Sequence, residues 1–276
     1  MLNNIIYFII TLLATTVCSL TGMGGGVIIK PIMDVIGDFN VHAISIICSI
    51  TVFSMALVSI VKHIKSKTKI PFNIALPLAI GSVIGGISGE RIFSLFVHFF
   101  DADEFIKIIQ NIILTILILW VFIYMNNKNK LGSKELKGVF PALIVGLFLG
   151  LCSAFLGIGG GPINVTVIVY LFSLPTKTAT ICSLITILFS QISKIITVAV
   201  TSGFSDLDFS VVIIMITAAT IGGFLGAYFN KKLSDKTVEK AFNCIVVVVL
   251  VLTIFNIINN LDIEIFKVYD IISNAN

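Results

Sequence analysis

Two glycine-rich stretches, Leu20-Thr-Gly-Met-Gly-Gly-Gly26 and Phe155-Leu-Gly-Ile-Gly-Gly-Gly161, decide how this chain folds. Each stretch interrupts an apolar region, the first running from Ile5 to Ile36 and the second from Val139 to Leu174. A helix can be interrupted at membrane depth only where its freed backbone groups find partners in protein or in a watered cavity. Each stretch therefore predicts a broken helix that is enclosed by the rest of the protein.

The composition places the chain in a membrane. Of its 276 residues 57% are hydrophobic and only 12% are charged, whereas soluble domains are about 25% charged. A single soluble core could not hide this much apolar surface. Six uninterrupted segments reach the length of about 20 residues that a spanning helix needs, and with the two interrupted regions they predict an all-α polytopic membrane protein. These six segments are 41–61, 72–97, 104–125, 178–200, 207–229 and 241–260.

The two halves of the chain match each other. Besides the glycine stretches, Cys48-Ser-Ile50 corresponds to Cys182-Ser-Leu184, and Ile84-Gly-Gly-Ile-Ser-Gly89 corresponds to Ile221-Gly-Gly-Phe-Leu-Gly226. The three landmarks keep their order and nearly their spacing, which indicates a duplicated unit. We expect a first transmembrane repeat over residues 1–126, a cytoplasmic linker over 127–137, and a second repeat over 138–276.

Lysine-rich linkers predict the orientation. Lysines gather in the linkers 62–69, 126–137 and 230–240, whereas 98–107 carries only Lys107 and 201–208 carries no Lys or Arg. The positive-inside rule makes the first three linkers cytoplasmic. Matched linkers then lie on opposite membrane sides, so the repeats are inverted and each half crosses an odd number of times.

With an odd number of crossings per half, both termini of this multi-pass cell-membrane protein lie on the outer side. Each repeat then holds three full transmembrane helices plus one glycine-broken region. That region either turns back as a re-entrant hairpin or makes two crossings, which the sequence leaves open.

The broken helices are the best candidates for a binding site. Free N–H groups at the start of a half-helix, together with the helix dipole, favour an anion. Inversion would bring the two breaks together near the membrane midplane, and Pro162 suits the first position of the second half-helix. The alternative is that the glycines only permit close helix packing. The predicted backbone donors are Gly24, Gly25, Gly26, Gly159, Gly160 and Gly161.

Polar side chains inside apolar segments are further candidates. Lys30 either pairs with Asp34 or faces the substrate, and the repeat-equivalent hydroxyls of Ser49 and Ser183 either bind substrate or join helices. We expect Lys194 to snorkel toward the outer surface. The adjacent Glu90 and Arg91 follow a glycine pair near a helix end, and we expect them to snorkel or to form ion pairs.

The doubled motif resembles the sulfite exporter TauE/SafE family of membrane transporters. The resemblance rests on Gly22-Met-Gly-Gly-Gly-Val-Ile-Ile-Lys-Pro31, on Gly157-Ile-Gly-Gly-Gly-Pro162, and on Ala179-Thr-Ile-Cys-Ser-Leu184. It covers about residues 5–260 and implies transport of small sulfur-containing anions such as sulfite or sulfonates. The second copy departs from the pattern, because Thr166 stands where the first copy has Pro31.

The leading hypothesis is a secondary transporter that exports or exchanges small anions. An anion channel could use the same glycine site, and an integral-membrane enzyme is a third alternative. No catalytic residues, metal ligands or cofactor motifs are predicted, and the glycine triplets lack the Lys-Ser/Thr of a nucleotide-binding loop. The expected partners are an anionic substrate and membrane lipid, but no nucleic acid. The sequence leaves open whether a coupling ion and a second copy of the chain also bind.

Overall fold

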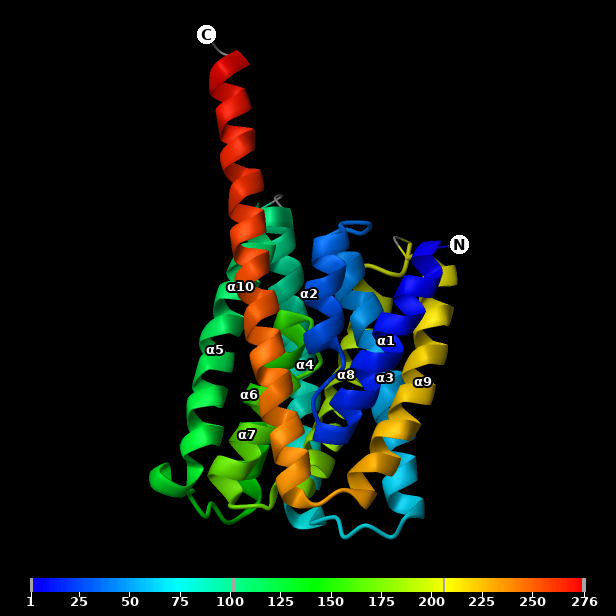
Figure 1. Cartoon of the computed structure of the whole chain (residues 1–276), viewed down its shortest axis with the longest axis vertical. Coiled ribbons are helices and arrows are strands. Elements are labelled where there is room, and N and C mark those ends of the chain that lie inside the picture. The colour runs from blue at the N-terminus through cyan, green and yellow to red at the C-terminus, as the bar shows by residue number, and fades with distance from the viewer. Residues whose placement is uncertain (1, 101–102, 206, 275–276) are drawn as a thin grey trace.

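The computed structural model describes residues 2–100, 103–205 and 207–274, and all regular structure in them is α-helical (Figure 1). Eight helices are long and apolar enough to cross a membrane, which confirms the predicted polytopic fold. The ten helices are α1 Leu2–Thr21, α2 Gly26–Ile36, α3 Val41–Lys65, α4 Phe72–Phe100, α5 Asp103–Leu131, α6 Val139–Leu156, α7 Gly161–Phe172, α8 Thr176–Thr201, α9 Phe209–Lys232 and α10 Asp235–Asn274.

Each interrupted region is a helical hairpin. α1 is followed by the 11-residue α2, and α6 by the 12-residue α7. At 1.5 Å per residue these short helices are about 17–18 Å long, which is too short for a hydrocarbon core of about 30 Å. In Figure 1 each short helix turns back toward the end from which its long partner came. The hairpins are therefore re-entrant, one of the two options that the sequence left open.

Glycines let the long helices approach backbone to backbone. α4 packs along α6, where methyl groups placed on Gly81 and Gly85 would lie 2.0 and 2.1 Å from carbonyl oxygens of α6. α9 packs along α1 in the same way, and a methyl group on Gly226 would lie 2.3 Å from the Thr16 carbonyl oxygen. In lipid no hydrophobic driving force holds helices together, so their association depends on van der Waals packing, and small residues permit the close approach that this packing needs.

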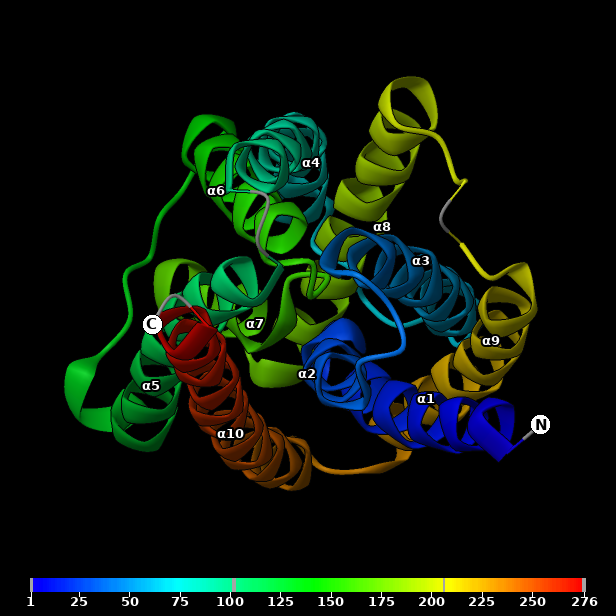
Figure 2. The ribbon, with the colours of Figure 1, turned by 90° about the horizontal axis from the view of Figure 1, so that it is seen from above.

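The helix neighbours are related by an exchange of the two halves (Figure 2). The pair α4 and α6 has its counterpart in α9 and α1, and the pair α4 and α8 has its counterpart in α9 and α3. The two last helices of the halves, α5 and α10, pack on each other. This arrangement supports a duplication with two-fold pseudosymmetry.

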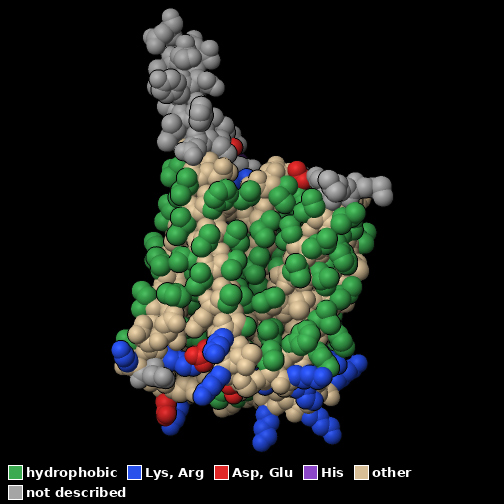
Figure 3. Space-filling model, viewed as in Figure 1, with side chains coloured by type: hydrophobic (Ala, Val, Ile, Leu, Met, Phe, Trp, Pro, Cys, Tyr) green, Lys and Arg blue, Asp and Glu red, His purple; other side chains and the backbone are tan. Residues whose placement is uncertain are grey.

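The lysines of the three basic linkers gather at one end of the bundle, the lower end in Figures 1 and 3, which we call the basic end. α1 begins at the opposite end, whereas the linker before α6 lies at the basic end, so α1 and α6 run in opposite directions (Figure 1). These directions agree with inverted repeats. The inversion itself, and the membrane side that the basic end faces, stay predictions.

Two helices extend beyond the expected segments. α5 continues to Leu131, into the expected linker, with a kink at Asn127 (φ −117°, ψ 15°). α10 spans Asp235–Asn274, whereas the expected segment is 241–260. Pro162 lies in the first turn of α7, directly after Gly161, whose φ is still positive (45°).

Candidate functional site

The two glycine stretches form tight turns that lie against each other inside the bundle. We call residues 22–25 the first turn and residues 157–160 the second turn; all eight are buried. A methyl group placed on Gly24 would lie 2.2 Å from the Gly159 carbonyl oxygen, and one on Gly26 would lie 2.7 Å from the Ile158 carbonyl oxygen. The expected meeting of the triplets is thus observed, and this close approach by itself explains why positions 24 and 26 hold glycine.

The backbone amides of all six predicted glycines have no hydrogen-bond acceptor among the described residues; four lie in the two turns, and Gly26 and Gly161 are the first residues of α2 and α7. The predicted residues are Gly24, Gly25, Gly26, Gly159, Gly160 and Gly161, and the amides of Gly22 and Ile158 have no acceptor there either. Helix N-termini leave their first N–H groups free, but a buried N–H without a partner is rare. The two turns therefore concentrate unsatisfied donors, and the positive ends of two helix dipoles, in one enclosed region.

Polar side chains of neighbouring helices hold the carbonyl groups of these turns. The Ser183 hydroxyl donates to the Gly22 carbonyl (2.7 Å), and the Thr180 hydroxyl donates to the Thr21 carbonyl (3.1 Å). In the first turn the Gly22 carbonyl thus accepts a bond from a side chain, whereas most amides of the two turns donate to no acceptor of the described residues; Met23 and Gly157, which donate to Cys18 and Ala154, are the exceptions. The turns therefore present more free donors than free acceptors.

Ser49, the repeat equivalent of Ser183, has a different partner. Its hydroxyl donates to the Ser45 carbonyl of its own helix at 2.7 Å, whereas Ser183 joins α8 to the first turn. The two serines, equivalent in the sequence match, thus differ in their hydrogen bonds. Contact of either serine with a substrate stays a prediction.

Lys30 follows the first turn and pairs with Asp34. The Lys30 Nζ lies 3.2 Å from Asp34 Oδ2, and both side chains are buried. The other carboxylate oxygen, Asp34 Oδ1, has no hydrogen-bond partner among the residues that the structure describes. This pair is one of the alternatives expected from the sequence, and it leaves part of the Asp34 charge uncompensated by direct contacts.

Lys194 does not snorkel; that prediction was wrong. Its side chain is completely buried, and its Nζ lies 3.0 Å from Glu90 Oε2. The Lys194 ammonium also donates to the Ser45 hydroxyl (2.6 Å) and to the Ala154 carbonyl (2.9 Å). The packing of α4 against α8 supplies the counter-ion, so the lysine has no need to reach the surface.

The two buried lysines converge beside the second turn. A methyl group placed on Gly157 would lie 2.8 Å from the Ser45 hydroxyl oxygen and 3.3 Å from Lys30 Cε. Since Lys194 donates to the same Ser45 hydroxyl, both ion pairs border one region. The cluster has no net formal charge, because Asp34 and Glu90 balance the two lysines.

Asn164 was missed by the sequence analysis. It lies in α7, one turn after Gly160, and is 1% exposed. Neither its amide nitrogen nor its amide oxygen has a partner among the described residues. An amide side chain in a largely apolar half-helix, directly after the glycine motif, was the available signal.

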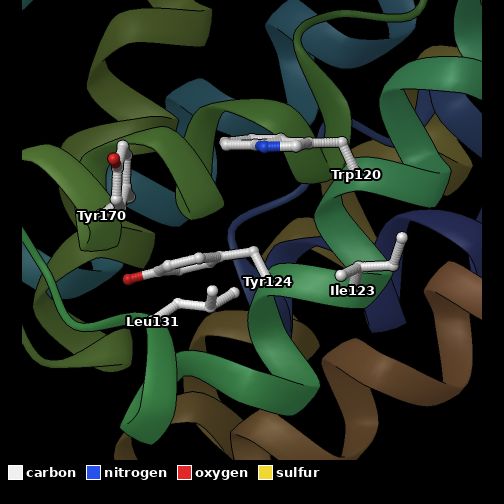
Figure 4. A pocket seen from close by; sticks show the side chains of 5 residues that line it. All are labelled: Trp120, Ile123, Tyr124, Leu131 and Tyr170. Atoms are coloured by element: carbon white, nitrogen blue, oxygen red, sulfur yellow. The ribbon is translucent and has the colours of Figure 1, made fainter.

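A pocket of about 250 Å³ lies elsewhere, between α5 and α7, and is lined by aromatic and aliphatic side chains (Figure 4). The Trp120 and Tyr124 rings stack at 6.1 Å, and the Tyr170 ring meets Tyr124 edge-on at 5.1 Å. Aromatic rings of this kind are typical of the membrane–water interface. The pocket carries none of the predicted site residues.

Fold and site together define a multi-pass membrane protein with two re-entrant hairpins that meet in its interior. Residues 7–253 match the family described as "Sulfite exporter TauE/SafE", so the chain belongs to this family and acts in membrane transport. It is similar to the "Probable membrane transporter protein YunE" of Bacillus subtilis (strain 168), with 22% identity, 90% of this chain and 96% of the relative being covered. No solved structure matches the chain.

Proposed function

We propose that this protein is a secondary transporter of small anions, in particular sulfur-containing oxyanions such as sulfite or a sulfonate. The observation that carries the proposal is the set of six buried amides in and directly after the facing turns that donate to no acceptor of the described chain. Leaving a buried donor unsatisfied costs about 1–3 kcal/mol. An oxyanion offers several acceptor oxygens and could satisfy more than one of these donors at once.

The charge balance of the site suits a carrier. Lys30 and Lys194 are each paired with a carboxylate, so neither offers an uncompensated charge that would trap an anion. Backbone dipoles hold an anion less firmly than a free buried ammonium does, which permits release. The Asn164 amide, with its nitrogen free, is a further donor beside the second turn.

The closed contact between the turns favours a carrier over a channel. With the Gly24 and Gly159 backbones touching, a substrate enters only when one hairpin moves relative to the other. Rocking of one repeat against the other is the common mechanism of inverted-repeat transporters. We further propose that the basic end is cytoplasmic and that both termini are outside, in line with the positive-inside rule.

Flux into proteoliposomes tests the proposal, with a panel that includes sulfite, a short sulfonate, sulfate and chloride. We expect saturable flux of sulfur oxyanions that follows an imposed ion gradient. Fast flux that neither saturates nor couples to a gradient would favour the channel, and no anion flux in any gradient would overturn the proposal.

A glycine variant locates the site. The sequence favours Gly160→Ala as the test, but Gly160 has φ +89°, where an alanine is strained. A loss of flux in this variant could therefore come from misfolding as well as from weaker substrate binding. Gly25 has φ −54°, and a methyl group there would meet only side chains, the nearest being Thr15 Cγ2 at 2.9 Å. Gly25→Ala should therefore lower flux about tenfold while folded protein stays near normal, whereas the packing control Gly226→Ala should mainly lower folded protein.

A further inference from the structure

A small polar pocket opens at the basic end between α3, α8 and α9. Its volume is about 90 Å³, which is the share of about three water molecules in the liquid and suits one small ion. We call it the basic-end pocket. Its polar lining consists of His63, Thr68, Lys177, Thr178, Asn230 and Lys231.

The charge of this pocket is positive. Lys177 Nζ donates to the Leu233 carbonyl at 3.0 Å and Lys231 Nζ to the Ser66 carbonyl at 3.5 Å. Both acceptors are neutral, and no carboxylate is among the lining residues. Lys177 and Thr178 also belong to the first turn of the 26-residue α8, whose first turn holds no acidic residue. The positive end of this helix dipole adds to the two lysines.

A buried imidazole nitrogen without a hydrogen-bond partner among the described residues lines the same pocket. His63 is 1% exposed, and its Nε2 has no hydrogen-bond partner among the described residues. Buried polar groups are normally satisfied. An imidazole nitrogen without a partner, in a pocket lined by two lysines, therefore points to a polar ligand, and the two ammonium groups favour an anion.

The pocket adjoins the first glycine turn. Asn230, on its wall, donates its amide to the Leu20 carbonyl at 2.6 Å. Thr178 on α8 lines the pocket, and Thr180 and Ser183, within the next five residues, hold the carbonyls of Thr21 and Gly22. The pocket wall is thus joined by hydrogen bonds to residues 20–22, the segment that leads into the first turn.

We infer that the basic-end pocket is a second anion site, at which a small oxyanion is loaded from the basic end before it reaches the glycine turns. The loading role rests on the proposed transport function, but the anion site does not. Lys177 and Lys231 supply the charge, and His63, Thr178 and Asn230 supply directed polar contacts. The lysines also draw anions toward this mouth from solution.

Cysteine protection tests the site without any transport measurement. Thr178→Cys is placed in a full-length background without the five native cysteines, in nanodiscs of phosphatidylcholine alone, so that no anionic lipid headgroup competes. We measure its modification by an anionic and by a cationic thiosulfonate reagent of equal size while sulfate is titrated. The anionic reagent should react faster, and sulfate should slow both reactions in a saturable way.

Lys177→Gln should raise the sulfate concentration for half-maximal protection about tenfold, which corresponds to about 1.4 kcal/mol. The matched control is Lys236→Gln, an exposed lysine at the same end that does not line the pocket. Unsaturable slowing, or equal shifts in both variants, would overturn the inference and indicate general screening. Protection that requires added anionic lipid would assign the pocket to a headgroup instead.

The transport role is tested separately through sidedness. In oriented proteoliposomes Lys177→Gln should raise the KM for anions entering from the basic end about tenfold and leave the KM from the other end unchanged. Equal KM changes from both ends would refute loading. Sulfate protection without any anion flux would keep the anion site and reject the proposed transport function.

Discussion

The two glycine turns have nearly the same sequence but different backbones. In the first turn only Gly22 has a positive φ, of 80°, and Gly25 has right-handed helical angles. In the second, Gly157, Gly159 and Gly160 all have positive φ, as does Gly161 at the start of α7. The half-helix that follows the first turn carries the Lys30–Asp34 pair, whereas the half-helix after the second turn carries Asn164 and Thr166.

The comparison shows that the helix packing is alike in the two halves, whereas the buried polar side chains are not. The helix neighbours and the glycine crossings recur in both halves. The buried charges do not, because Lys194 corresponds to Ile60 and Lys30 corresponds to Val165 at the landmark offsets. Two halves with matching helix packing thus hold different polar groups: the half-helix after the first turn carries an ion pair, and the half-helix after the second turn carries a neutral amide.

The largest effect is expected from Lys194→Met. The change leaves Glu90 as a buried carboxylate without its partner, which costs about 3–5 kcal/mol. The yield of monodisperse protein should collapse, and its thermal unfolding midpoint should fall. The double variant Lys194→Met/Glu90→Gln, which removes both charges, should recover most of the loss. Normal yield of the single variant would show that the ion pair is dispensable for folding.

Within the first turn, Gly24→Ala should destabilise the protein far more than Gly25→Ala. The new methyl group at position 24 would overlap the Gly159 carbonyl oxygen, and backbone cannot move aside cheaply. We expect a loss of about 1–3 kcal/mol, measured as a drop in the unfolding midpoint. Equal midpoints for the two variants would mean that the turns do not touch in the membrane.

Between the turns, Gly160→Ala should be more destabilising than Gly25→Ala. The left-handed angles of Gly160 cost an alanine about 1–2 kcal/mol, whereas Gly25 already has right-handed angles. Thermal unfolding of both variants at matched protein and lipid concentrations provides the measurement. The reverse order would contradict the observed difference in turn conformation.

Asn164→Leu should separate stability from function. The variant makes the second half-helix resemble the first, which has Ile29 at this position. Removing a buried amide without partners should leave stability unchanged or raise it by about 1 kcal/mol, while anion flux should fall. Thermal unfolding and proteoliposome flux, compared on one preparation, test this. Full flux would exclude Asn164 from the substrate path.

The smallest perturbation tests the inversion itself. Lys67 lies in the linker between α3 and α4, and Ser202 lies in the matching linker between α8 and α9. The single variants Lys67→Cys and Ser202→Cys should leave stability and flux unaltered. In a background without native cysteines, a membrane-impermeant reagent should label them from opposite sides of the membrane. Labelling from one side would replace the inverted repeat by a parallel one.

Much of the fold could be predicted because lipid simplifies the problem. Hydrophobic segments of sufficient length have to become helices, so the sequence predicts α3, α4, α5, α8, α9 and α10, although α10 extends well beyond the expected 241–260, from Asp235 to Asn274. The glycine motifs marked the two breaks for the same reason. The extension of α5 to Leu131 was missed because polar residues continue a helix beyond the membrane without any apolar signal.

The sequence by itself determined the membrane class, the helix breaks and the family, and it predicts the duplication. It did so because these depend on composition, length and local backbone freedom. Only the tertiary structure decided which polar groups meet: Lys194 with Glu90, Ser183 with the Gly22 carbonyl, and His63 with Lys177 in one pocket. Such pairings join residues far apart in the chain, and they depend on which helix faces pack together. Hydropathy does not encode that choice.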